Sequence, residues 1–149
     1  MYKSILVPLD GSKRAERILS HVEELAHCFE AKVVLLRVVE PSFDATSPHN
    51  TNAKLRADVV GQSVDKAKSY LAALQGGFRE KGIQVKTIIE KGAVVMWICN
   101  VAEREDVDPI AMASHGRTGL ERVFYGSVAA GVLHRVDRPL LLIRAGETK

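Results

Sequence analysis

The sequence has few cysteines and no long apolar run. Its two cysteines, Cys28 and Cys99, lie far apart, each among apolar neighbours. We expect reduced, buried thiols and no disulfide bond. The apolar start of the chain, residues 5–9, is short and stops at Asp10, and no run reaches membrane-spanning length. These absences predict a soluble, cytoplasmic protein with neither a signal peptide nor a membrane partner.

Neither sign of charge dominates the chain. Twenty-one Lys and Arg face eighteen Asp and Glu, which leaves a formal net charge of +3, and the two signs are interspersed. Proteins that bind nucleic acid usually cluster their basic residues, so no nucleic-acid partner is expected. The five histidines show no pair at i, i+4. A metal site built from protein ligands alone is therefore not expected.

A regular alternation of apolar segments is present instead. Apolar runs predict strands at residues 4–9, 32–38, 83–89, 109–113 and 139–143. Apolar stripes at three- and four-residue steps predict helices at residues 15–29, 54–81, 94–102 and from 127 onward. Residues 40–53, with two prolines, form the one long irregular connection. Strict alternation predicts one domain, residues 1–149, of the α/β class, with a doubly wound parallel sheet and helices on both faces.

The most informative stretch is residues 113–127, ASHGRTGLERVFYGS. Ser114 and Gly116 are followed by a nine-residue spacer that ends in Gly126 and Ser127. Glycines and small hydroxyl residues between a strand and a helix start let backbone amides approach phosphate oxygens. The stretch therefore predicts a phosphate-facing loop. In doubly wound sheets such a loop lies beyond the carboxyl ends of the strands, where the strand order reverses.

Motifs for efficient phosphoryl transfer are missing. Gly126 and Gly131 have the glycine spacing of a P-loop, but Val132 stands where its lysine belongs. No GxGxxG follows the first strand. Asp10 is the one carboxylate expected near the phosphates, so the chain is not expected to be an enzyme, or at most a slow one. Asp10 also has a simpler reading, in which it forms a turn that ends the strand, with Ser12 as a helix cap.

Three segments resemble the universal stress protein family over essentially the whole chain: ILVPLDGS from residue 5, VVLLRVVEP from residue 33, and the spaced glycines that end in Gly126 and Ser127. The resemblance implies a five-stranded sheet in the order 3-2-1-4-5. It also implies a homodimer with residues 139–143 near the twofold axis. The ligand that it implies is ATP or another adenine nucleotide, with or without Mg²⁺.

The resemblance also assigns residues to the nucleotide. Val38 matches a position whose backbone reads the adenine edge, and the others match positions around adenine, ribose and phosphates. Ala113 departs from the family pattern, which has a glycine there; a methyl in extended backbone can point aside, whereas a positive φ angle would strain it. The residues assigned in this way are Pro8, Leu9, Asp10, Val38, Met112, Ala113, His115, Gly116, Gly126, Ser127 and Val128.

The function expected from this resemblance is a stress-response regulatory module that acts through ligand occupancy. ATP would order residues 115–124 and change the surface that meets a second copy or another protein. Two alternatives stay open. The first is a dimerising universal stress protein in which Ala113 prevents ATP binding. The second is a slow ATPase.

Overall fold

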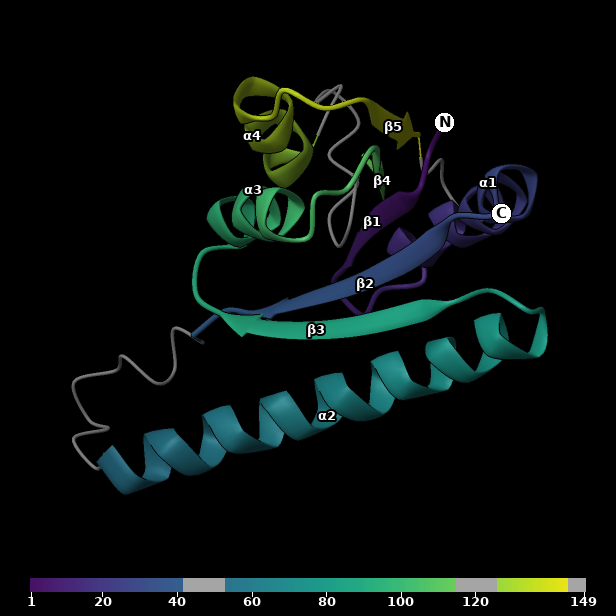
Figure 1. The fold of residues 1–149 in the computed structure, drawn as a ribbon. Helices are drawn as coiled ribbons and strands as arrows, with labels where there is room; N and C mark the ends of the chain where they lie inside the picture. Colours follow the sequence, from purple (N-terminus) through teal and green to yellow (C-terminus); the bar gives the residue numbers. More distant parts are fainter. Residues whose placement is uncertain (42–52, 115–125, 145–149) are drawn as a thin grey trace.

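The computed structural model describes residues 1–41, 53–114 and 126–144, with residues 53–60 described as backbone only. Its centre is a five-stranded sheet in the order β3-β2-β1-β4-β5, in which all pairs of neighbouring strands are parallel (Figure 1). The predicted fold class and strand order are confirmed. The elements are β1 (Ser4–Leu9), the 3-10 helix η1 (Ala15–Ile18), α1 (Leu19–Phe29), β2 (Lys32–Val39), α2 (Ala53–Glu80), β3 (Val85–Lys91), α3 (Val94–Arg104), β4 (Ile110–Ala113), α4 (Ser127–Arg135) and β5 (Leu140–Ile143).

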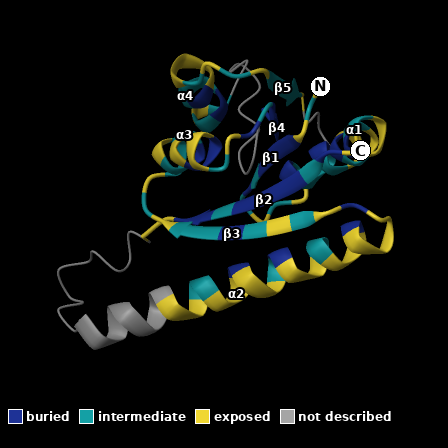
Figure 2. Ribbon diagram, viewed as in Figure 1, coloured by how far each residue is buried: buried dark blue, intermediate teal, exposed yellow. Residues whose placement is uncertain are grey.

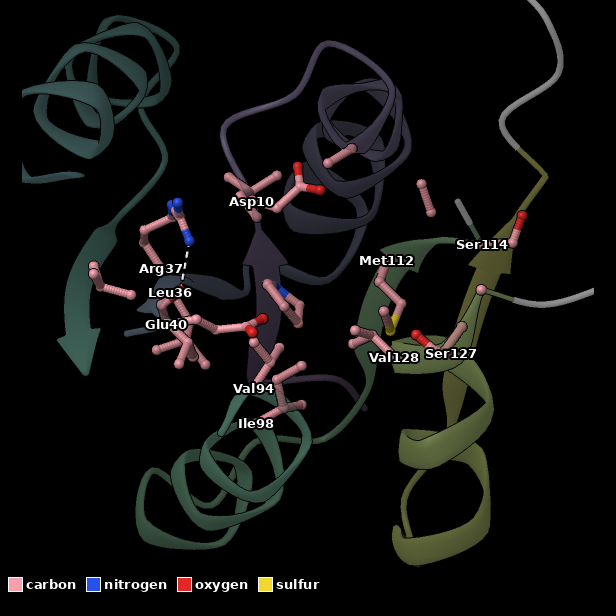
Figure 3. A pocket seen from close by; sticks show the side chains of 18 of the residues that line it. Asp10, Leu36, Arg37, Glu40, Val94, Ile98, Met112, Ser114, Ser127 and Val128 are labelled. Atoms are coloured by element: carbon pink, nitrogen blue, oxygen red, sulfur yellow. Dashed lines mark hydrogen bonds between the residues drawn. The ribbon is translucent and has the colours of Figure 1, made fainter. Parts of the chain in front are cut away.

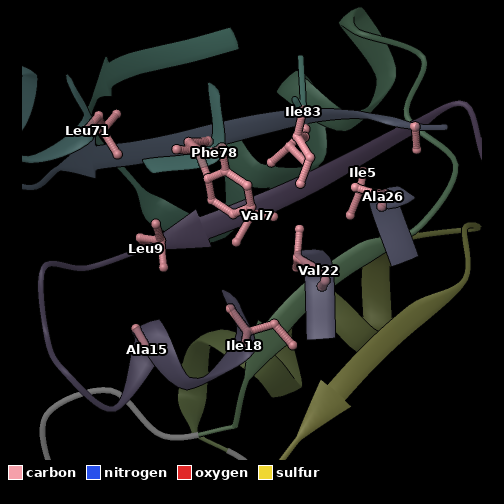
Figure 4. Packing of buried hydrophobic residues seen from close by; sticks show 14 residues of the cluster. Ile5, Val7, Leu9, Ala15, Ile18, Val22, Ala26, Leu71, Phe78 and Ile83 are labelled. Atoms are coloured by element: carbon pink, nitrogen blue, oxygen red, sulfur yellow. The ribbon is translucent and has the colours of Figure 1, made fainter. Parts of the chain in front are cut away.

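Helices cover both faces of the sheet, and each face has its own apolar core. Alternate residues of a strand point to opposite faces, so β1 sends Ile5 and Val7 to one side and Leu6 to the other. The first side packs against α1 and α2 (Figure 4), and the second against α3 and α4. The central strands are buried on both faces, as Figure 2 shows. Such burial explains why their sequences are almost continuously apolar.

Three sequence predictions need correction. Helix 15–29 begins as the 3-10 turn η1 before α1. The third strand starts at Val85 rather than Ile83, because Gly82 turns the chain at φ 77° and the Ile83 N–H donates to the Phe78 carbonyl at 3.0 Å. Cys28 is exposed, although a buried thiol was expected. It lies two residues, about 200° of helical rotation, from the buried Ala26, and so faces away from the sheet.

Helices α3 and α4 approach closely at a glycine. A Cβ built on Gly131 would lie 2.8 Å from Val95 Cγ2, which is nearer than normal packing allows. The absence of a side chain at Gly131 therefore lets α4 lie against α3. This contact helps to place the first turn of α4, which lies at the carboxyl edge of the sheet.

We expect Gly131→Ala to lower the free energy of unfolding by about 1 kcal/mol, because overpacking against Val95 outweighs the gain in helix propensity. The matched control is Gly76→Ala in α2, where an added Cβ meets nothing within 4 Å. That variant should be more stable by up to about 1 kcal/mol. Urea unfolding measures both changes. Equal stabilisation by both substitutions would show that the α3–α4 contact does not depend on Gly131.

Candidate functional site

A cavity of about 540 Å³ opens at the carboxyl ends of β1, β2 and β4 (Figure 3). In the order β3-β2-β1-β4-β5, the chain reverses its direction of travel between β1 and β4. The cavity therefore lies at the switch point, where ligands of doubly wound sheets bind. Its far wall is formed by the start of α4, from Gly126 to Ala129.

Asp10 at the end of β1 lines the cavity and also builds a turn. Its Oδ1 accepts a hydrogen bond from the Ser12 N–H at 2.8 Å, and the Ser12 Oγ accepts one from the Ala15 N–H at 3.1 Å. Gly11 between them has φ 86°, which favours glycine. The turn in the simpler reading of this segment is confirmed, but the residue at the N-cap position of η1 is Arg14 rather than Ser12. Because Asp10 also faces the cavity, that reading is compatible with contact to a ligand.

Ser114 joins the end of β4 to the start of α4. Its N–H donates to the Ile143 carbonyl at 2.8 Å, and its own carbonyl accepts from the Gly126 N–H at 2.6 Å. Gly126 is the N-cap of α4 and supplies no side-chain cap. Ser127 is therefore the first helical residue, not the cap. The first amides of a helix lack intrahelical acceptors and carry the positive end of its dipole, so this end of the cavity attracts anions.

The Ser114 hydroxyl is buried, and none of the residues that the structure describes forms a hydrogen bond with it. Ser114 is 4% exposed and lines the cavity. Buried hydroxyls are almost always hydrogen-bonded. An oxygen-rich ligand group at the start of α4 would supply the missing bond.

The backbone conformation of Ala113 shows whether this position needs a positive φ angle, which the sequence left open. It is the last residue of β4, pairs with Ile143 of β5 and is absent from the described residues with positive φ. Its backbone is therefore ordinary extended strand, and alanine is not strained there. The alternative in which this position needs a positive φ does not apply.

Most of the residues assigned from the resemblance share this one cavity. His115 and Gly116 lie outside the described residues. Contact of the others with a nucleotide stays a prediction. The residues that line the cavity are Pro8, Leu9, Asp10, Val38, Met112, Ala113, Gly126, Ser127 and Val128.

Arg37 and Glu40 line the cavity as well, and the sequence analysis missed both. Arg37 is the one charged residue inside the run VVLLRVV, and a lone charge in a buried strand is the signal that could have identified it. Glu40 follows β2 and adds a second carboxylate to Asp10. The cavity therefore presents charges of both signs along its mouth.

The uncharged hydroxyl of Tyr70, on α2, is subject to the electrostatic field of several of these charged groups. Burial raises the pKa of the Tyr70 hydroxyl well above its ordinary value, and the Glu16 and Asp10 carboxylates raise it further. The positive charge of Arg37 acts on this pKa in the opposite direction. Tyr70 therefore stays protonated at neutral pH. Asp10 and Arg37, which both line the cavity, thus act on this pKa in opposite directions.

Two general features of the described part of the chain can be stated. No three His, Cys, Asp or Glu side chains there come together closely enough to hold a metal ion. Among the helices described, none combines the length and apolar character that crossing a bilayer requires.

Comparison with known proteins points to one family. The profile of the Universal stress protein family matches residues 1–144. Universal stress protein MJ0577 of Methanocaldococcus jannaschii is 28% identical over 155 residues, which covers 97% of this chain and 96% of that protein. A solved structure of MJ0577 superposes with a TM-score of 0.87 at 30% identity and covers 99% of both chains.

Two more distant structures share the fold. One is a universal stress protein in complex with cAMP, 18% identical with a TM-score of 0.70, covering 97% of this chain and 98% of that one. The other is the Archaeoglobus fulgidus universal stress protein in complex with dAMP, 20% identical with a TM-score of 0.67, covering 96% of this chain and 98% of that one. These two likenesses concern the fold alone. The family match spans nearly the whole sequence, and this chain belongs to the universal stress protein family.

Proposed function

We propose that this protein is a regulatory module that binds ATP or another adenine nucleotide in the switch-point cavity. The observation that carries the proposal is the buried Ser114 hydroxyl, which has no partner among the described residues and belongs to a residue whose backbone carbonyl accepts from Gly126 at the start of α4. A phosphate oxygen there would accept from the hydroxyl and from the first amides of the helix. The complexes of two family members with cAMP and dAMP support this ligand class.

The proposed mode of action is occupancy rather than catalysis. Of the carboxylates that line the cavity, Asp10 already accepts the Ser12 N–H through Oδ1. Mg²⁺ is usually held by substrate phosphates with one or two carboxylates, so Asp10, alone or with Glu40, would complete its coordination. Bound nucleotide stabilises only the states that bind it. Residues 115–125 connect Ser114 to Gly126, and we propose that nucleotide orders residues 115–124 and so changes a partner surface. The protein partner and a cytoplasmic location stay predictions.

Isothermal titration calorimetry with ATP, with and without Mg²⁺, tests the proposal. We expect saturable binding by the wild type and binding weaker by about tenfold or more in Ser114→Ala, because a hydrogen bond to a charged oxygen is lost. The stability of Ser114→Ala without nucleotide should not fall, since no residue in the described part of the chain bonds to the hydroxyl. The control is Ser69→Ala, an exposed serine of α2.

Three results would contradict this proposal. The first is no heat with wild type at millimolar ATP, together with no adenine nucleotide in an acid extract of the purified protein. The second is equal affinity in Ser114→Ala and wild type. The third is phosphate release from ATP above that of a mock preparation, because it would favour the slow ATPase instead.

We also propose that the protein is a homodimer formed along β5. This strand is the edge of the sheet beside β4, and all four of its apolar side chains are only half-buried. The carbonyls of Pro139 and Ile143 accept from the N–H groups of Ile110 and Ser114, at 2.9 and 2.8 Å. Odd-numbered residues thus face β4, and the backbone of Leu142 faces the open edge. A second copy could pair there and cover the apolar side chains.

Leu142→Pro tests this arrangement. The substitution removes the Leu142 N–H, which points to the open edge, and leaves every hydrogen bond between β5 and β4 in place. We expect a dimeric wild type and a monomeric Leu142→Pro by light scattering coupled to size exclusion. Leu142→Ala is the matched control, since it shortens the side chain and keeps the N–H, and it should remain dimeric. A monomeric wild type would refute the homodimer. A dimeric, folded Leu142→Pro would refute pairing through this edge.

A further inference from the structure

The carbonyl of Val38 is left without a strand partner. The Val39 carbonyl accepts from the Gly92 N–H at 3.0 Å, on the β3 side of β2. Successive residues of a parallel strand bond to opposite neighbours, so the Val38 carbonyl points to the β1 side. The last pair between β1 and β2 is Leu9 with Arg37, one residue earlier. The Val38 carbonyl therefore faces the cavity, where the β1 ladder has ended.

The side chain of Arg37 forms a hydrogen bond with that carbonyl. Its Nη1 donates to the Val38 oxygen, as the dashed line in Figure 3 shows. Both residues line the cavity. A group entering the cavity therefore meets a guanidinium donor at this point, where a bare carbonyl would have been an acceptor.

The two common kinds of purine differ in the group on carbon 6, which is the group that would approach the Val38 carbonyl if the base lies where the family resemblance assigns it. Adenine carries a 6-amino donor, whereas guanine and hypoxanthine carry a 6-oxo acceptor. A free Val38 carbonyl suits the amino group. With Arg37 on the carbonyl, an amino group meets a second donor with a positive charge, while an oxo group can accept from the guanidinium.

We propose that Arg37 determines the base specificity of the cavity. By donating to the Val38 carbonyl, it removes the higher affinity that a free carbonyl would give to adenine over a 6-oxopurine. The proposal rests on the proposed function, because it requires a purine nucleotide at this site. Adenine binds only when Arg37 releases or shares the Val38 carbonyl. A 6-oxopurine binds with Arg37 in place.

The experiment compares ATP with inosine triphosphate, which carries an oxo group in place of the 6-amino group. Calorimetry gives the affinity of each for wild type and for Arg37→Met, which keeps the length of the side chain and has no donor. We expect wild type to bind the two triphosphates within about threefold of each other, and Arg37→Met to prefer ATP by about tenfold. The control is Arg79→Met, an exposed arginine in the last turn of α2, which should behave as wild type.

The outcomes separate this proposal from the proposed function. A wild type that prefers ATP by about tenfold or more overturns the role of Arg37, even if Arg37→Met does not fold. An unchanged ratio of affinities in a folded Arg37→Met also overturns it, while nucleotide binding itself stands. If no variant binds either triphosphate, the proposed function is wrong, and the specificity proposal falls with it.

Discussion

The early end of β1 is the constraint on which the site depends. The strand stops at Leu9, and the turn of Asp10, Gly11 and Ser12 takes the chain away from the sheet, held by the Asp10 carboxylate and the positive φ of Gly11. Strand β2 continues to Val39. The backbone beyond the last shared pair then has no ladder partner, and the space above the end of β1 becomes the cavity. Packing elsewhere supports this edge, since Gly131 lets α4 lie against α3 and present its first turn there.

The sequence predicted the parts of the fold that follow from apolar periodicity. Continuous apolar runs identified the central strands, because strands covered on both faces have no polar positions. The stripe in α2 was confirmed at its described positions, with Ala67, Leu71 and Phe78 buried against the sheet. The strand order needed the family resemblance, since periodicity does not say which strands are neighbours. The residues assigned from the resemblance line one cavity wherever they fall in the described part of the chain.

What the sequence could not predict depends on atoms brought together by tertiary structure. Ser127 has the residue type of an N-cap, but the hydrogen bond from Gly126 to the Ser114 carbonyl places the helix start one residue earlier. Cys28 has apolar neighbours in sequence, yet its helical angle turns it to solvent. The role of Arg37 was not predicted, because an apolar run indicates a buried strand and does not indicate what its one charged side chain contacts. Its hydrogen bond to the next carbonyl exists only because β1 ends where it does.

The order of the strands also determines the order of polar groups across the cavity. Because β1 lies between β2 and β4, Asp10 must lie between Arg37 and Ser114 (Figure 3). Donors thus stand at both ends, the guanidinium on one side and the first amides of α4 on the other, with a carboxylate acceptor between them. A nucleotide has phosphate acceptors at one end and ribose hydroxyl donors in its middle, and that polarity matches two of the three positions whichever base is bound. At the third position the backbone of β2 offers no free carbonyl, because the Arg37 side chain already donates to the Val38 oxygen, and under our proposal this is where the group at carbon 6 of a purine would matter.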